Sequence, residues 1–183
     1  HFGNSAPMCS KAVDSDGLVM HVASFSKCLA PGYRLGWVAA GRYARQIQRQ
    51  KLSTSLATTI PVQTAIADYL KQGAFDNHLR QLRRRLAEQE ALLAAAVEHA
   101  FPPGIRLARP QGGYFVWIEL PPGVDALLLH RQALERGISI APGPIFSAKR
   151  EFGNYLRLNF GHPDAARQAD AIALLGQLIG QQL

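Results

Sequence analysis

Residues 24–36 read SFSKCLAPGYRLG and follow directly on an apolar run that contains Val19, Met20, Val22 and Ala23. The change from apolar to polar composition predicts a loop that leaves a buried strand. The loop gathers two hydroxyl groups, one primary amine, a Pro-Gly turn and one guanidinium group into a single short segment. This segment therefore bears on both the fold and the chemistry of the chain.

The side chains of this loop suit an anionic aldehyde. Lys27 can form a Schiff base with an aldehyde if its surroundings keep the amine partly neutral. Ser24 and Ser26 can donate hydroxyl hydrogens to a phosphate, and Arg34 has a planar fork that matches phosphate oxygens. Pyridoxal 5'-phosphate needs both an imine partner and a phosphate cradle. The alternative is that Lys27 and Arg34 are ordinary surface residues beside a Ser/Pro/Gly turn.

The loop also resembles a known motif, the lysine signature of the aspartate aminotransferase superfamily of fold type I. The resemblance rests on the pattern Ser24-x-Ser26-Lys27 followed by Pro31-Gly32-x-Arg34-x-Gly36. It implies that Lys27 is the catalytic residue that forms the internal aldimine with pyridoxal phosphate. It further implies that Ser24, Ser26 and Arg34 bind the phosphate of the cofactor.

A second motif lies near the C-terminus, where the chain reads YLRLNF over residues 155–160. A charged arginine within an apolar strand is costly unless it has a partner, so Arg157 is expected to meet an anion. In the superfamily that this strand resembles, the arginine binds the α-carboxylate of the amino-acid substrate. The alternative is a structural ion pair with an acidic residue such as Glu119 on a neighbouring strand.

The order of expected elements also resembles the superfamily, from about Gly17 to the C-terminus. The apolar spacing predicts strands near 18–23, 35–40, 105–107, 114–120, 138–141 and 155–160, and helices over 41–51, 61–71, about 25 residues before Pro102, 125–136 and 164–181. The expected fold class is α/β. Residues 1–74 are expected to hold the last strands of the large pyridoxal-phosphate domain, 75–101 the long connecting helix, and 102–183 a small C-terminal α/β domain.

The basic residues are unevenly distributed. The net charge is +7, and residues 17–67 hold six basic residues and no acidic one. A local positive field suits an anionic cofactor and carboxylate substrates. Arg42, Arg45 and Arg49 are spaced for one face of a helix, which predicts a solvated face or, alternatively, a docking surface for another domain or subunit.

Other classes of site and location find little support. Cys9 and Cys28 have no paired spacing, and the six histidines are scattered, so neither a disulfide framework nor a metal site is expected. No apolar run approaches the ~20 residues of a membrane span, and no signal segment is apparent. A cytoplasmic location without membrane contact is the default expectation.

One expected partner of the cofactor is missing. Pyridoxal enzymes place a carboxylate on the pyridine nitrogen, and no acidic residue lies between Asp16 and Asp68. The resemblance places that carboxylate, the aromatic residue that stacks on the ring and a Gly-rich phosphate turn earlier in the chain. We therefore expect the sequence to be the C-terminal portion of a longer protein, and expect this portion alone to bind the cofactor poorly or not at all.

Two functional classes share these motifs. The first is the aminotransferase-like domain of GntR/MocR-type transcription regulators, which senses pyridoxal phosphate or an amino-acid effector through aldimine formation. The lysine loop and the run DNHLRQLRR over residues 76–84 resemble these regulators somewhat more closely. The alternative is a metabolic class I/II aminotransferase that moves an amino group between an amino acid and a 2-oxo acid; a degenerate structural module is a third class.

The resemblance has consequences for partners as well. It implies an amino-acid or 2-oxo-acid ligand and a homodimer. For a regulator it also implies that DNA is bound only through a separate N-terminal domain outside this sequence.

Overall fold

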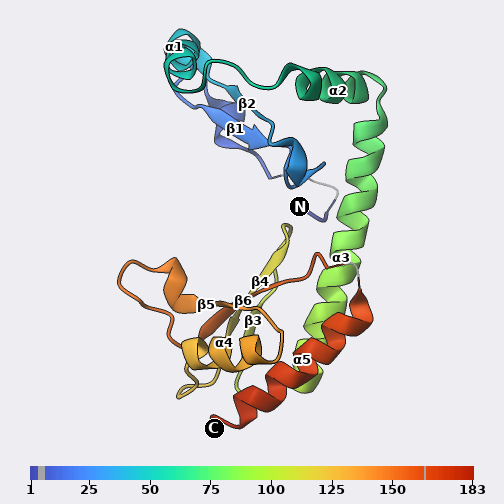
Figure 1. Ribbon diagram of the computed structural model, residues 1–183, viewed down its shortest axis with the longest axis vertical. Coiled ribbons are helices and arrows are strands. Elements are labelled where there is room, and N and C mark those ends of the chain that lie inside the picture. The colour runs from blue at the N-terminus through green and yellow to red at the C-terminus, as the bar shows by residue number, and fades with distance from the viewer. Residues whose placement is uncertain (4–6, 163) are drawn as a thin grey trace. The chain divides into compact units, whose positions relative to one another are not determined.

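The computed structural model describes residues 1–3, 7–162 and 164–183, which form two compact units (Figure 1). The N-terminal unit comprises Asn4–Leu82, and the C-terminal unit comprises His1–Gly3 together with Arg83–Leu183. Helix α3 (Ala74–Ala100) begins in the first and ends in the second, as the expected long helix. The division into domains at residues 74 and 101 stays a prediction. None of the helices within the described ranges is long and apolar enough to cross a membrane.

The N-terminal unit is built on a two-stranded antiparallel hairpin. Its elements are η1 (Ser10–Val13), β1 (His21–Ser24), η2 (Pro31–Tyr33), β2 (Gly36–Ala39), η3 (Gly41–Tyr43), α1 (Ala44–Ser55) and α2 (Ile60–Lys71). Both expected strands are present, although β1 begins only at His21. Helix α1 begins later than expected because a 3-10 turn precedes it, whereas Pro61 lies in the first turn of α2 as predicted.

This unit buries few of its apolar side chains. Among its described residues, Phe25, Ala40 and Ile66 are buried. By contrast, its large exposed apolar side chains are Met8, Val13, Leu18, Met20, Val22, Tyr33, Trp37, Val38, Leu52, Leu56, Ile60 and Leu70. Such limited burial offsets only a small part of the conformational entropy that the chain loses on folding. We therefore expect this unit to be stabilised by contacts beyond those within the described residues.

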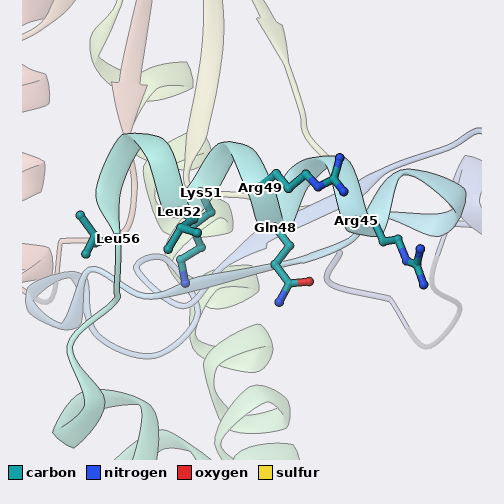
Figure 2. Close-up of a pocket in the computed structure, with 6 residues that line it drawn as sticks. All are labelled: Arg45, Gln48, Arg49, Lys51, Leu52 and Leu56. Carbon is teal, nitrogen blue, oxygen red and sulfur yellow. The ribbon is translucent and has the colours of Figure 1, made fainter.

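Helix α1 carries the basic face that the arginine spacing predicted. None of its residues is buried, and it contains no acidic residue. Figure 2 shows the side chains that line a pocket beside this helix: Arg45, Gln48, Arg49, Lys51, Leu52 and Leu56. Arg42 lies before the helix, where its guanidinium carbon is 5.5 Å from the centre of the Tyr43 ring. The face is exposed to solvent in the described chain, and its use as a docking surface stays a prediction.

The C-terminal unit contains a four-stranded antiparallel sheet in the order β3-β4-β6-β5. Its elements are β3 (Arg106–Ala108), β4 (Phe115–Glu119), α4 (Ala126–Glu135), β5 (Ala141–Pro142), η4 (Gly143–Phe146), β6 (Tyr155–Asn159) and α5 (Ala165–Gly180). The strand predicted over residues 138–141 is wrong for most of its length, because β5 begins only at Ala141. The Ile138 amide closes the end of α4 by donating to Ala133, and Pro142 has no amide to continue the ladder.

The sheet buries one face and leaves the other accessible. Val116 and Ile118 of β4 and Leu156 and Leu158 of β6 are buried, while the residues between them are not. This alternation follows from the two-residue period of a strand. In Figure 1, α5 crosses the second half of α3. The large buried apolar side chains of α3, α4 and α5 include Leu93, Val97, Leu129, Ile172, Leu175, Leu178 and Ile179.

A buried acidic residue interrupts the apolar stripe of α3. Glu90 is 6% exposed and accepts two hydrogen bonds from Arg109, at 3.0 Å from Nε and 2.9 Å from Nη2. The pKa of Arg109 is raised by the hydrogen bonds to Glu90 and by its negative charge. Such a fork-to-carboxylate pair is strong and directional. It therefore joins α3 to the segment between β3 and β4.

Candidate functional site

The hairpin β1–β2 holds the two ends of the lysine loop together. Ser24 lies opposite Gly36 in the strand register, and the Phe25 amide donates to the Leu35 carbonyl at 2.9 Å. A Cβ at Gly36 would lie 2.5 Å from the Ala23 carbonyl oxygen, a distance at which the backbone would have to shift. Glycine at this position of the motif is therefore required by the close approach of the two strands.

Within the loop, a tight turn displays Lys27. The amides of Leu29 and Ala30 both donate to the Phe25 carbonyl, at 2.9 and 3.1 Å. The ring of Phe25 is buried, whereas Lys27 is exposed. The turn thus anchors an aromatic side chain and presents the lysine that follows it two residues later.

The structure links all three predicted phosphate-binding residues by hydrogen bonds. Arg34 Nη1 donates to Ser26 Oγ at 3.3 Å, and the Ser26 amide donates to Ser24 Oγ at 3.1 Å. These groups lie on either side of Lys27 in the sequence. The loop therefore combines an amine with hydroxyl and guanidinium donors, which is the donor set that a phosphate-bearing aldehyde requires.

Arg34 also has an unusual backbone. Its φ of 49° and ψ of 35° fall in the left-handed region, which non-glycine residues seldom adopt. Residues held in such conformations concentrate at ligand-binding and catalytic sites. The strain is compatible with a binding role, because it fixes where the Arg34 side chain leaves the turn after Pro31-Gly32.

Arg157 lies on β6, where it faces Trp117 across the sheet. Its guanidinium carbon is 4.1 Å from the centre of the Phe115 ring and 4.4 Å from that of Phe146. Two aromatic rings thus supply cation–π contacts to one guanidinium group. They restrain its orientation without neutralising its charge.

The alternative ion pair between Arg157 and Glu119 is wrong. Glu119 lies opposite Tyr155 in the strand register, and its Oε2 is 3.5 Å from Nη1 of Arg106. Glu119 also raises the pKa of Tyr155, although loss of hydration is the larger cause of that shift. Among residues 1–3, 7–162 and 164–183, no carboxylate lies within ion-pair distance of Arg157. The charge of Arg157 therefore remains available for an anionic ligand.

Three contact residues of these sites were missed from the sequence: Phe115, Phe146 and His78. Phe146 follows the Pro-Gly-Pro turn and has no periodic relation to β6, so no sequence pattern indicates its contact with Arg157. His78 belongs to the run over residues 76–84, but that pattern assigns it no partner. Its Nε2 lies 2.9 Å from the Cys28 carbonyl oxygen in the lysine loop.

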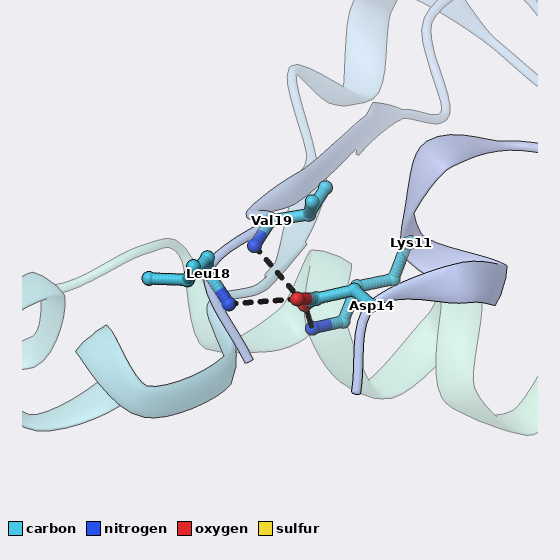
Figure 3. A network of polar contacts seen from close by, with 4 residues as sticks. All are labelled: Lys11, Asp14, Leu18 and Val19. Atoms are coloured by element: carbon cyan, nitrogen blue, oxygen red, sulfur yellow. Dashed lines mark hydrogen bonds and ion pairs between the residues drawn. The ribbon is translucent and has the colours of Figure 1, made fainter. Parts of the chain in front are cut away.

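A polar network fastens the segment that leads into β1 (Figure 3). The carboxylate of Asp14 accepts from Lys11 Nζ at 2.7 Å and from the amides of Leu18 and Val19 at 2.8 and 3.0 Å. The hydrogen bond from Lys11 is the main cause that lowers the pKa of Asp14 from 3.8 to about 2, and the two amides assist it. The network stabilises the ionised form of Asp14.

The Asp14 network is expected to weaken in acid. Because the pKa of Asp14 is lower in the folded protein, its stabilising contribution is complete above about pH 4 and disappears as the pH falls toward 2. NMR titration of the carboxyl group should give a midpoint near 2. The Asp14→Asn variant should be less stable than the wild type at neutral pH. On acidification its free energy of unfolding should fall by less than that of the wild type. Equal acid sensitivity of the two proteins would contradict this role.

The chain matches one protein family and several known proteins over most of its length. The profile of the family "aminotransferase class I and II" matches residues 2–172. The chain is 43% identical over its whole length to the uncharacterized HTH-type transcriptional regulator YdcR of Escherichia coli K12, and covers 39% of that protein. It is 33% identical, over 94% of its length, to aromatic-amino-acid aminotransferase 1 of Thermococcus litoralis, of which it covers 42%.

A solved structure matches the described fold closely. The α-aminoadipate aminotransferase LysN of Thermus thermophilus, in complex with N-(5'-phosphopyridoxyl)-L-leucine, superposes with a TM-score of 0.91 at 31% identity. The match covers 99% of this chain and 47% of that one. The chain thus spans less than half the length of each of these relatives. The expected α/β fold, the C-terminal part of an aminotransferase fold, is confirmed.

Proposed function

The chain belongs to the aminotransferase class I and II family, and from this premise we propose that it is the pyridoxal-phosphate-binding portion of a GntR/MocR-type transcription regulator. The observation that carries this proposal is the 43% identity to an HTH-type regulator along the entire chain. We propose further that the whole protein senses pyridoxal phosphate or an amino acid, acts as a cytoplasmic homodimer, and contacts DNA through a separate N-terminal domain.

Each predicted residue has a separate task in this proposal. Lys27 forms the covalent bond to the cofactor, and Ser24, Ser26 and Arg34 bind its phosphate. Arg157 binds the carboxylate of the amino acid, in an orientation restrained by Phe115 and Phe146. When bound, pyridoxal phosphate would supply an electron-withdrawing ring that stabilises negative charge on the amino acid.

A metabolic aminotransferase is the second candidate, and the 33% identity to an aromatic-amino-acid aminotransferase favours it. Turnover by the full-length protein separates the two. A regulator should bind amino acid and cofactor but convert amino acid plus 2-oxo acid far more slowly than the rate of about 1 s⁻¹ or more that is usual for enzymes. It should also retard DNA from its own promoter region. Sustained turnover without DNA binding would contradict the regulator proposal.

Arg34 is expected to contribute strongly to cofactor affinity. In the full-length protein, Arg34→Ala removes a charge-assisted contact and should weaken pyridoxal-phosphate binding by about 1.5–3 kcal/mol. Arg34→Lys should restore only part of the affinity, because lysine lacks the planar fork. Equilibrium titration of the cofactor measures this loss. Arg45→Ala, which removes an exposed arginine of α1, serves as the control, and an unchanged dissociation constant in Arg34→Ala would exclude a phosphate-binding role.

A further inference from the structure

The lysine loop is held by a residue that lies fifty positions further along the chain. His78 Nε2 is 2.9 Å from the Cys28 carbonyl oxygen, and both residues are partly buried in the N-terminal unit. A carbonyl oxygen only accepts hydrogen bonds, so the contact assigns the hydrogen to Nε2 of His78. The first turns of α3 therefore donate a hydrogen bond to the residue directly after Lys27.

A ring contact accompanies this hydrogen bond. Phe75 lies three residues before His78 and thus on the same side of α3. Its ring meets that of Phe25 edge to face, with centroids 6.1 Å apart, and meets Tyr69 at 6.4 Å. Phe25 and Cys28 lie on either side of Lys27 in the sequence. One side of the helix therefore contacts the loop both before and after the lysine.

The hydrogen bond from His78 fixes a whole peptide group. The Cys28 carbonyl and the Leu29 amide belong to the same planar peptide unit. His78 binds the carbonyl of this unit, and the Phe25 carbonyl accepts from its amide at 2.9 Å. Because the peptide plane is held at both its carbonyl and its amide, it cannot rotate without breaking one of these two hydrogen bonds. Its orientation closes the turn that carries Ser26 and Lys27.

We propose that His78 is a positioning residue for Lys27, which acts by holding the Cys28–Leu29 peptide and so the turn that displays the lysine amine. The role for Lys27 rests on the function proposed above. The contact between His78 and Cys28 does not rest on that function, because it is present in the described chain without any cofactor.

The test compares two amide substitutions in the full-length protein. In His78→Gln the side-chain nitrogen can reach approximately the position of Nε2, whereas in His78→Asn it is one methylene too short. In cofactor-free protein, hydrogen exchange of the Leu29 and Ala30 amides should be roughly 3- to 10-fold faster in His78→Asn, the effect of losing one ordinary hydrogen bond. His78→Gln should exchange at nearly the wild-type rate.

A second readout follows Lys27 directly. After brief exposure to pyridoxal phosphate and borohydride, the modified fraction of Lys27 should fall several-fold in His78→Asn and recover in His78→Gln. Asn77→Ala, an exposed neighbour on the same helix, should match the wild type in both measurements. The same loss in Asn77→Ala would indicate general weakening of α3 and overturn the proposal.

Two further outcomes would also overturn the proposal. The first is that His78→Asn shows the wild-type rates of amide exchange and the wild-type trapping of Lys27. The second is that the Leu29 and Ala30 amides exchange equally fast in His78→Gln and His78→Asn. If wild-type Lys27 is never trapped, the proposed function fails, while the exchange rates still decide whether His78 holds the loop.

Discussion

Lys27→Ala in the full-length protein should abolish covalent attachment of pyridoxal phosphate. In the wild type, borohydride reduction followed by peptide mass mapping should place nearly all of the label on Lys27. The alanine variant should show only background, because an imine with an aldehyde requires a primary amine. This is the largest effect that we expect from any single substitution in the chain.

The same substitution should leave the fold almost unchanged. Lys27 is exposed, and substitutions of exposed residues usually alter the free energy of unfolding by less than about 0.5 kcal/mol. Lys51→Ala, which removes an exposed lysine of α1, provides the matched control and should keep the label. Modification of another lysine while Lys27 stays unmodified would contradict the assignment.

The lysine loop was predictable because its chemistry is contiguous in the sequence. A single segment supplies Ser24, Ser26, Lys27 and Arg34, and the strand on either side follows from apolar composition. The hairpin then brings Arg34 to Ser26 through local geometry. The roles of these residues stay predictions, whereas the fold that presents them is confirmed.

The surroundings of Arg157 were only partly predictable. The sequence shows that a charge lies within an apolar strand, but it cannot show which of several distant groups lies beside it. Glu119 is a candidate partner because it is acidic and lies in a neighbouring strand, yet the strand register places it opposite Tyr155. Phe146 contacts Arg157 instead, from a turn whose path depends on the whole C-terminal unit.

The contact of His78 with the lysine loop illustrates the same limit. Helical spacing predicts that Phe75 and His78 share one side of α3, but not which segment that side meets. Similarly, Glu90 interrupts the apolar stripe of α3, and only the structure shows Arg109 as its partner. Long-range pairs of this kind depend on tertiary packing, which short-range sequence patterns do not specify.

Arg157→Ala should separate cofactor binding from ligand binding. In the full-length variant, the absorbance of lysine-bound pyridoxal phosphate should persist, because Arg157 has no part in that bond. The spectral change on adding an amino acid should require much higher concentrations or disappear. Removing the charged partner of the carboxylate should weaken ligand binding by about 2–4 kcal/mol.

The aromatic contacts of Arg157 sharpen this prediction. Arg157→Lys keeps the positive charge but loses the planar group that lies against Phe115 and Phe146, so it should restore little of the affinity. Arg106→Ala is the matched control, since Arg106 belongs to the same sheet and its side chain is 83% exposed. This variant should respond to amino acids as the wild type does.

The expected outcome for Arg157 is the same for an aminotransferase and for a regulator that senses an amino acid, because both bind the amino-acid carboxylate. Titration of the spectral change against amino-acid concentration therefore tests the site itself, and measured turnover tests the class of function. If Arg157→Ala responds to amino acids with wild-type affinity, the carboxylate role is wrong. Phe115 and Phe146 would then restrain a cation that serves the packing of the sheet rather than a ligand.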